Sequence, residues 1–224
     1  SRVHWAISHA AQRQRIRPLE TAPLDVLVKT HAAVAMTDGY ATITAEFTRG
    51  AIYVLRDPRD IAPSLAGHYG QSIDEAITQM TSAHTIRNRA DTGALSGALL
   101  PMFHYVGRWD DHVQSWADAG ANLVRYEDLH ANSLRVLRRL CRKFSLPYRQ
   151  AGARRAVECC AFARLRAMED RDGFREASHG KFFRVGKAGA WRRSLTGEQV
   201  ARIETAFGPT MRRFGYEPDV AIAA

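Results

Sequence analysis

The stretch IYVLRDPRDIAPS, residues 52–64, decides the fold, because it joins a buried strand to a helix within a few residues. The apolar residues at its start are typical of a strand, and they stop abruptly at Arg56. Asp57 is a residue type preferred at helix N-caps, and Pro58 suits the first helical position. We therefore predict a strand before Arg56 and a helix that ends at Gly70.

Two further apolar runs end in polar residues in the same way. The run over residues 24–30 ends with Lys29 and Thr30 and is followed by His31, and residues 122–125 lead into Tyr126. Three buried strands that alternate with helices predict an α/β fold with a central, mainly parallel sheet flanked by helices. The carboxyl ends of such strands form the edge where open α/β sheets bind ligands, so we expect one site there.

Composition and charge set broad limits on the function. The chain has 224 residues, of which 46% are hydrophobic, and we expect a single domain over residues 1–224. The net charge of +9 favours a polyanionic partner, which from charge alone is a nucleic acid, an anionic surface or a phosphorylated small molecule. Lys and Arg residues on solvated faces account for the charge equally well.

The three cysteines, Cys141, Cys159 and Cys160, form neither a disulfide framework nor a zinc-binding pattern. Reduced thiols of this kind favour a cytoplasmic location. No apolar run approaches the roughly 20 residues that span a bilayer. We expect neither a bound metal nor a transmembrane segment.

Further helices are predicted from apolar spacing and capping residues. The expected ranges are residues 72–80 with Ser72 as the cap, 106–116, 137–144, 150–169 with a break near Cys160, and a terminal helix that starts at a capping box of Thr196 and Gln199. Residues 88–101 contain two glycines and a proline, and they are predicted to form a loop.

Arg56 stands at the mouth of the predicted sheet, where its planar guanidinium is suited to bidentate binding of a phosphate. Ser64 would lie near it on the following helix and offer a hydroxyl to the same anion. The alternative is a structural ion pair between Arg56 and either Asp57 or Asp60, which for this residue alone is the better account.

Three other positions carry candidate chemistry. Lys29 and His31 are two residues apart, so on a strand their side chains would project to the same side and form a cation–base pair. The ring of Tyr126 is suited to lie against a nucleotide base. The segment FFRVGKAGAW, residues 182–191, combines cations, glycines and aromatics, and it predicts a backbone nest for an anion. A histidine under a loop, a buried tyrosine and a solvated basic loop are the respective alternatives.

Taken together, these motifs resemble the bacterial sulfotransferases that use 3′-phosphoadenosine-5′-phosphosulfate (PAPS) as the sulfuryl donor. The resemblance runs from about Asp25 to Tyr216. It rests on five motifs in the family's order, which are residues 29–31, 53–60 with Ser64, 126–129, 160–162, and 184–186 with 189–191. It implies a P-loop-NTPase-like three-layer α/β fold and a metal-independent transferase that releases adenosine 3′,5′-bisphosphate.

The resemblance also assigns roles to individual residues. His31 would be the general base, and Lys29 would stabilise the transferring group, so both are expected to be catalytic. The expected donor-binding residues are Arg56, Ser64, Arg184 and Gly186 for the 3′-phosphate and Tyr126 and Phe162 for the adenine. The acceptor would be a hydroxyl or amine of a small molecule, a lipid or a glycan. From composition alone, and not from the resemblance, residues 87–101 with 103–105 are expected to face it.

The sequence departs from the family pattern in two places. Val185 stands where the family usually has a lysine, which removes one donor near the 3′-phosphate. The family's N-terminal loop for the 5′-phosphosulfate has no counterpart, since no glycine precedes Gly39. We therefore expect that the first strand and its loop are missing through truncation or an incomplete record.

Three other functions remain open. A nucleotide kinase-like phosphotransferase would need a Walker-type loop and Mg²⁺ ligands, and neither is visible. A basic nucleic-acid-binding module would explain the net charge, but no binding motif is present and the basic residues look scattered along the chain. A non-catalytic nucleotide-binding relative is the third interpretation, because the phosphosulfate loop is missing.

Overall fold

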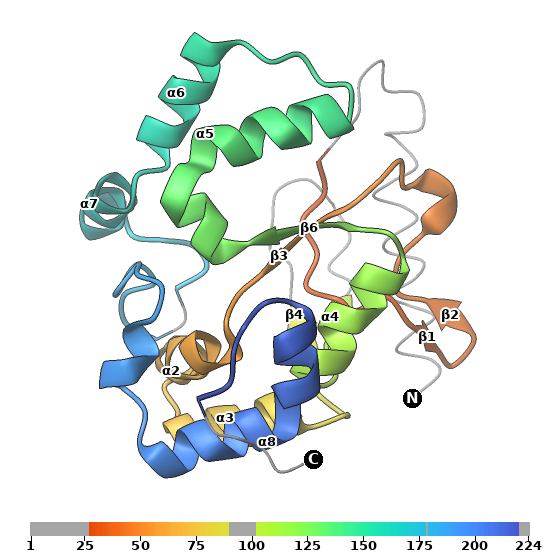
Figure 1. Ribbon diagram of the computed structural model, residues 1–224, viewed down its shortest axis with the longest axis vertical. Coiled ribbons are helices and arrows are strands. Elements are labelled where there is room, and N and C mark those ends of the chain that lie inside the picture. The colour runs from red at the N-terminus through yellow and green to blue at the C-terminus, as the bar shows by residue number, and fades with distance from the viewer. Residues whose placement is uncertain (1–26, 90–101, 178, 220–224) are drawn as a thin grey trace. The chain divides into compact units, whose positions relative to one another are not determined.

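The computed structural model describes residues 27–89, 102–177 and 179–219 (Figure 1). The chain falls into two compact units. The first comprises residues up to 51 together with 79–122, and the second comprises residues 52–78 together with 123 onward. Strands and helices alternate along the chain, as expected for the α/β class.

In the second unit, the predicted strand-to-helix turn is confirmed. β3 (Ile52–Leu55) leads into α2 (Pro58–Tyr69). The Asp57 carboxylate accepts a hydrogen bond from the Arg59 backbone N–H at 2.9 Å, which caps the helix as predicted. Gly70 ends the helix in the left-handed conformation, with a φ of 65°.

β3 pairs with β6 (Asn122–Arg125), and the two strands run parallel. Their starts lie together, because the Asn122 backbone N–H donates to the Ala51 carbonyl at 2.8 Å. Their ends lie together as well, because the Asp57 backbone N–H donates to Oε1 of Glu127 at 3.3 Å. Parallel strands with their carboxyl ends side by side are what the sequence predicted for this pair.

The remaining elements of the second unit are the start of α3 (Ile73–Thr81), α5 (Tyr126–Lys143), α6 (Gln150–Cys159), α7 (Phe162–Asp172), the short 3-10 helix η3 (Ala190–Arg193) and α8 (Gly197–Arg213) (Figure 1). α3, α6, α7 and α8 lie close to their predicted places, whereas η3 was not predicted. The break near Cys160 and the capping box of Thr196 and Gln199 are confirmed. α5 begins earlier than the apolar spacing indicated, since a non-helical Asn132 interrupts its periodicity.

A buried ion network joins α2 to α8. Arg59 is 3% exposed, and its guanidinium donates to Oδ2 of Asp57 at 2.8 Å and to Oε1 of Glu204 at 2.7 Å. The same guanidinium lies 4.2 Å from the ring centre of Trp191. Glu204 is fully buried and also accepts from the Asp219 backbone N–H at 2.9 Å. The apolar part of this core includes Ala62, Ala66, Ile203, Phe207 and Met211.

The first unit is organised by α4 (Trp109–Asp118), at the predicted place. The Trp116 indole N–H donates to the Ala32 carbonyl at 3.0 Å, and the Ser115 hydroxyl accepts from the Val34 backbone N–H at 3.1 Å. These bonds hold the chain after residue 31 against the helix. A small antiparallel hairpin follows, formed by β1 (Met36–Thr37) and β2 (Tyr40–Ala41), and then the 3-10 helix η2 (Ala45–Phe47).

The strand predicted over residues 24–30 is wrong in its described part. Residues 27–30 are irregular, and Leu27 and Val28 are 91% and 66% exposed. A strand needs a neighbour that satisfies its backbone N–H and C=O groups, and no described strand pairs with this segment. The argument that Lys29 and His31 project to one side of a strand therefore fails.

The loop predicted over residues 88–101 is also partly wrong. β4 (Ile86–Arg89) pairs with β5 (Met102–Tyr105) in antiparallel register, with Arg89 opposite Met102. The glycine and proline positions that suggested a loop lie outside the described residues. So do residues 90–101 of the proposed acceptor-facing segment and residues 24–26 of the proposed first strand. None of the described helices is long and apolar enough to cross a membrane.

We predict that Arg59→Leu costs about 3–5 kcal/mol in the free energy of unfolding, because it leaves the Asp57 and Glu204 carboxylates buried without their cation. Arg202→Leu is the matched control, since it removes a largely exposed ion pair with Asp74 and should cost less than about 1 kcal/mol. Urea unfolding followed by circular dichroism measures both. Equal costs for the two variants would contradict a structural role for the buried network.

Candidate functional site

The ends of β3 and β6 bring Arg56 and Tyr126 together. The Cζ atom of Arg56 lies 4.4 Å from the ring centre of Tyr126, and Nη2 of Arg56 donates to the Lys187 carbonyl at 3.0 Å. Nε of Arg56 is buried and has no hydrogen-bond partner among the described residues. Because a buried guanidinium N–H without an acceptor is unfavourable, this atom is well placed to donate to an anionic ligand.

The ion-pair alternative for Arg56 is confirmed with Asp60 and not with Asp57. Nη2 of Arg56 forms a salt bridge with Oδ2 of Asp60 at 3.8 Å, beyond hydrogen-bond distance, while Asp57 is occupied by Arg59. The guanidinium is therefore held in place by a carbonyl, an aromatic ring and the Asp60 carboxylate, and its Nε still has no acceptor among the described residues.

Residues 182–191, the segment predicted to form an anion nest, are anchored by two buried carboxylates. Asp60 on α2 is 2% exposed, and its two oxygens accept from the backbone N–H groups of Gly189 at 2.6 Å and Trp191 at 2.9 Å. Glu169 on α7 is 8% exposed and accepts from the N–H groups of Phe182 at 2.5 Å and Phe183 at 2.9 Å. Both ends of the segment are thus fixed by charge-assisted hydrogen bonds.

Between these anchors, Arg184 lies across α2. A Cβ atom added at Gly67 would fall 1.0 Å from Nη1 of Arg184, so a side chain there would displace the guanidinium from this position. Nη2 of Arg184 donates to the Ser64 carbonyl at 2.5 Å. The Ser64 side chain is exposed on the same helix, which puts the predicted serine next to the predicted second arginine.

Gly186 and Phe162 make the next close contact. Gly186 has a φ of 62°, and a Cβ atom there would lie 2.2 Å from the Phe162 ring. Phe162, the first residue of α7, therefore packs directly on the backbone of Gly186. Position 186 needs a glycine for two reasons, the left-handed backbone conformation and this close contact. Phe183 adds an edge contact to Phe162, with ring centres 6.1 Å apart.

The protonation state of Tyr126 is set by its surroundings. Burial raises the pKa of its phenol, Asp60 and Glu127 raise it further, and the nearby Arg56 opposes them. Because the net direction is upward from an ordinary pKa near 10, the phenol keeps its proton at neutral pH. The ring beneath Arg56 is therefore uncharged and has a hydroxyl to donate.

The second unit thus contains all six residues predicted to bind the donor. Arg56 contacts Tyr126, Arg184 contacts Ser64, and Gly186 contacts Phe162. Lys29 and His31 belong to the first unit. Both have exposed side chains, and the His31 carbonyl lies 3.2 Å from Nε2 of His112 on α4.

Three residues of this site were missed in the sequence. Glu169 belongs to no recognisable sequence motif. Gly67 lies inside a helix, where a glycine does not by itself predict a functional role. Asp60 was named only as a possible ion-pair partner of Arg56, and its hydrogen bonds to residues 189 and 191 required the fold. Among the described residues, no cluster of side chains has the composition of a metal site.

The sulfotransferase domain family matches residues 11–215 of this chain. A curated relative, cytosolic sulfotransferase 16 of Arabidopsis thaliana, is 26% identical over 175 residues, which are 68% of this chain and 48% of that protein. The chain therefore spans about half the length of this curated relative.

Solved structures share the fold. Mouse sulfotransferase SULT7A1 complexed with PAP matches with a TM-score of 0.63 at 16% identity, over 88% of this chain and 69% of that one. Retinol dehydratase in a complex with retinol and PAP matches with a TM-score of 0.50 at 19% identity, over 78% and 49%. These likenesses show a P-loop-like α/β fold of the sulfotransferase type.

We predict that Asp60→Asn speeds amide hydrogen exchange at Gly189 and Trp191 by about 10- to 100-fold, because the neutral amide has one acceptor oxygen and gives up charge-assisted bonds of about 1.5–3 kcal/mol. Glu169→Gln should speed amide hydrogen exchange at Phe182 and Phe183 only. NMR measures the exchange rates in both variants. Asp74→Asn, which alters an exposed carboxylate, is the control, and unchanged exchange in Asp60→Asn would refute the anchoring.

Proposed function

The chain belongs to the sulfotransferase domain family, and from this premise we propose that it transfers a sulfuryl group from PAPS to a hydroxyl or amine acceptor. The observation that carries the proposal is the cationic site in the second unit. There, Arg56 has an unpartnered buried Nε, and Arg184 and Gly186 lie in a segment fixed by two buried carboxylates.

We assign the donor's 3′-phosphate to Arg56, Ser64 and Arg184, with the Gly186 backbone as a further contact. Two guanidinium groups suit a dianionic phosphate, because each presents donors in a planar fork. Tyr126 and Phe162 are assigned to the adenine, since both offer aromatic surface next to these groups. Val185 is 56% exposed and contributes no donor of the kind that the family's lysine supplies.

The reaction is an in-line displacement at sulfur, for which the protein supplies position and charge rather than a covalent intermediate. His31 accepts the proton of the acceptor hydroxyl or amine, the freed nucleophile forms a bond to sulfur, and the bond from sulfur to the 5′-phosphate breaks. Adenosine 3′,5′-bisphosphate leaves with the electron pair. Lys29 stabilises the charge on the transferring group or on the leaving oxygen.

The acceptor is proposed as a class only. The retinol dehydratase structures hold small apolar alcohols, retinol in one and androsterone in another, and these ligands belong to those proteins. A small-molecule, lipid or glycan hydroxyl is the proposal for this chain. We place the activity in the cytosol, which agrees with the name of the plant relative and with three free cysteines.

Turnover tests the proposal directly. The protein is incubated with PAPS carrying ³⁵S and a panel of phenols, sterols and aliphatic alcohols, and label transfer is followed by chromatography. Transfer that needs PAPS and is not supported by ATP is the expected result. Transfer of phosphate from ATP would favour a kinase-like enzyme, and nucleotide binding without transfer would favour a non-catalytic relative.

We predict that Arg56→Gln lowers the affinity for adenosine 3′,5′-bisphosphate by about 10- to 100-fold, because charge-assisted hydrogen bonds contribute about 1.5–3 kcal/mol. The affinity for adenosine 5′-monophosphate should stay the same, since it lacks the 3′-phosphate. Calorimetry measures both, with the exposed Arg193→Gln as the control. An equal loss for the two nucleotides would remove Arg56 from the 3′-phosphate site.

His31→Ala should reduce turnover by about 100- to 10,000-fold, the usual contribution of a general base. Its affinity for adenosine 3′,5′-bisphosphate should remain within about twofold of the unchanged protein, because a base that acts on the acceptor does not hold the nucleotide. Loss of both properties together would argue for a structural role of His31.

A further inference from the structure

The net charge of the protein is concentrated in one stretch, residues 135–166. Ten of the 32 Lys and Arg residues of the chain lie there, with a single acidic residue, Glu158, out of 23. The rest of the chain carries 22 basic and 22 acidic residues and is therefore neutral. The expectation that the basic residues are scattered is wrong, and the net charge of +9 belongs to residues 135–166, which cover the second half of α5, α6 and the start of α7.

On α5 the cations line one side of the helix. Arg135, Arg138, Arg139, Arg142 and Lys143 recur at intervals of three and four residues, and all five are exposed. Val136, which is 5% exposed, is the buried residue of this helix and lies at the edge of the stripe. Like charges at this spacing repel by about 0.2–0.5 kcal/mol per pair, so the stripe destabilises the isolated helix unless an anion neutralises it.

The ten basic side chains of this stretch are called here the basic face, and only Arg166 has a carboxylate near it among the described residues, that of Asp170. They are Arg135, Arg138, Arg139, Arg142, Lys143, Arg149, Arg154, Arg155, Arg164 and Arg166, and all are exposed. Outside this face, exposed arginines such as Arg171 and Arg202 pair with Asp172 and Asp74. The basic face is therefore left available for an external anion.

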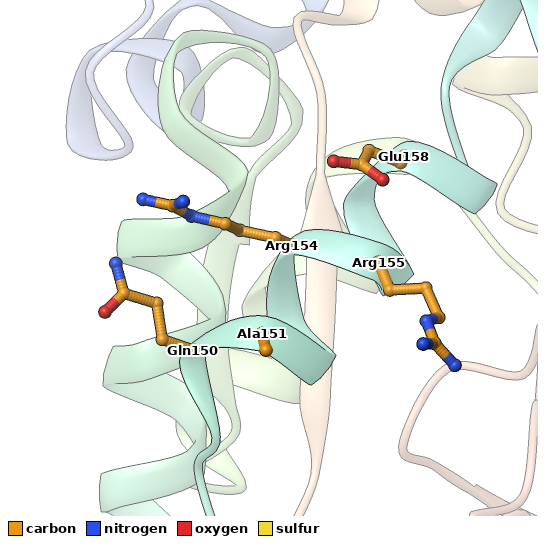
Figure 2. A pocket seen from close by; sticks show the side chains of 5 residues that line it. All are labelled: Gln150, Ala151, Arg154, Arg155 and Glu158. Atoms are coloured by element: carbon orange, nitrogen blue, oxygen red, sulfur yellow. The ribbon is translucent and has the colours of Figure 1, made fainter.

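The basic face does not form a small anion pocket. α6 packs against α5 and lines an open cavity of about 630 Å³, which contains Gln150, Ala151, Arg154, Arg155 and Glu158. Figure 2 shows Arg154 and Arg155 pointing in opposite directions from this helix. Diverging guanidinium groups cannot grip one phosphate, but they can meet many anions spread over a surface.

We propose that the basic face docks the protein on an anionic phospholipid bilayer. Nine of its ten cations are arginines, which bind phosphodiester groups bidentately. Leu146 within this stretch and Met168 two residues after it are also exposed, at 42% and 43%, and such apolar side chains suit the boundary between headgroups and acyl chains. Because α5 packs its apolar side inward, the helix lies on the bilayer surface and does not insert.

A nucleic acid fits this face less well. Sequence-tolerant binding of single strands relies on exposed aromatic rings that stack on bases. The aromatic residues between positions 135 and 166 are Phe144, Tyr148 and Phe162, and none of them is exposed. None of the ten cations is assigned to the donor, so docking and sulfuryl transfer can fail independently.

Vesicle co-sedimentation tests the proposal with the full chain. We expect binding to vesicles of phosphatidylcholine with about 30 mol% phosphatidylserine, little binding to pure phosphatidylcholine, and release at high salt. Arg138→Gln, Arg139→Gln and Arg142→Gln together should weaken binding by about 100-fold, since each cation at such a surface strengthens it by about fivefold. The corresponding triple Lys variant should keep most of the binding.

A matched control distinguishes an effect of the basic face from an effect of the protein's net charge. Arg193→Gln, Arg212→Gln and Arg213→Gln together remove the same charge from exposed positions elsewhere and should leave vesicle binding nearly unchanged. Thermal unfolding checks that all variants fold. Equal loss in the two Gln triples, equal binding to both vesicle types, or tighter binding to a DNA duplex than to anionic vesicles would each overturn the proposal.

Discussion

The buried Asp60 carboxylate joins the two parts of the proposed donor site. Asp60 lies in the first turn of α2, four residues after Arg56, and accepts hydrogen bonds from the backbone N–H groups of Gly189 and Trp191. One residue earlier, Arg59 stacks on Trp191 and reaches Glu204 on α8. A short turn of helix therefore fixes both the arginine at the strand end and the segment that carries Arg184. Neither group would be preorganised for an anion without this connection.

Local chemistry explains what the sequence predicted well. The strand-to-helix turn at Arg56, the Asp57 cap and the Thr196–Gln199 capping box depend on neighbours within a few residues, so their patterns are readable along the chain. The strand predicted over residues 24–30 failed because an apolar run becomes a strand only beside a partner. The pairing of β4 with β5 and the anchoring by Glu169 join residues that are distant in sequence and carry no local signal.

The site residues divide in the same way. Arg56, Tyr126, Arg184 and Gly186 were found through motifs whose residue types suit a phosphate and a base, whereas Gly67 and Glu169 became visible only through their contacts. The net charge of +9 is read directly from the composition, but the kind of anion that the cations can bind depends on where they lie in the structure. At the donor site a few cations converge around one segment, and on the basic face ten cations spread over three helices. The two arrangements suit different anions.

The central claim is that Arg56 and the anchored segment 182–191 hold a phosphate on the ribose 3′ position. The most direct measurement is calorimetric binding of adenosine 3′,5′-bisphosphate and adenosine 5′-monophosphate to the unaltered protein. The account predicts that the bisphosphate binds about 100-fold more tightly or better, through at least two additional charge-assisted hydrogen bonds. Equal affinities for the two nucleotides would contradict it.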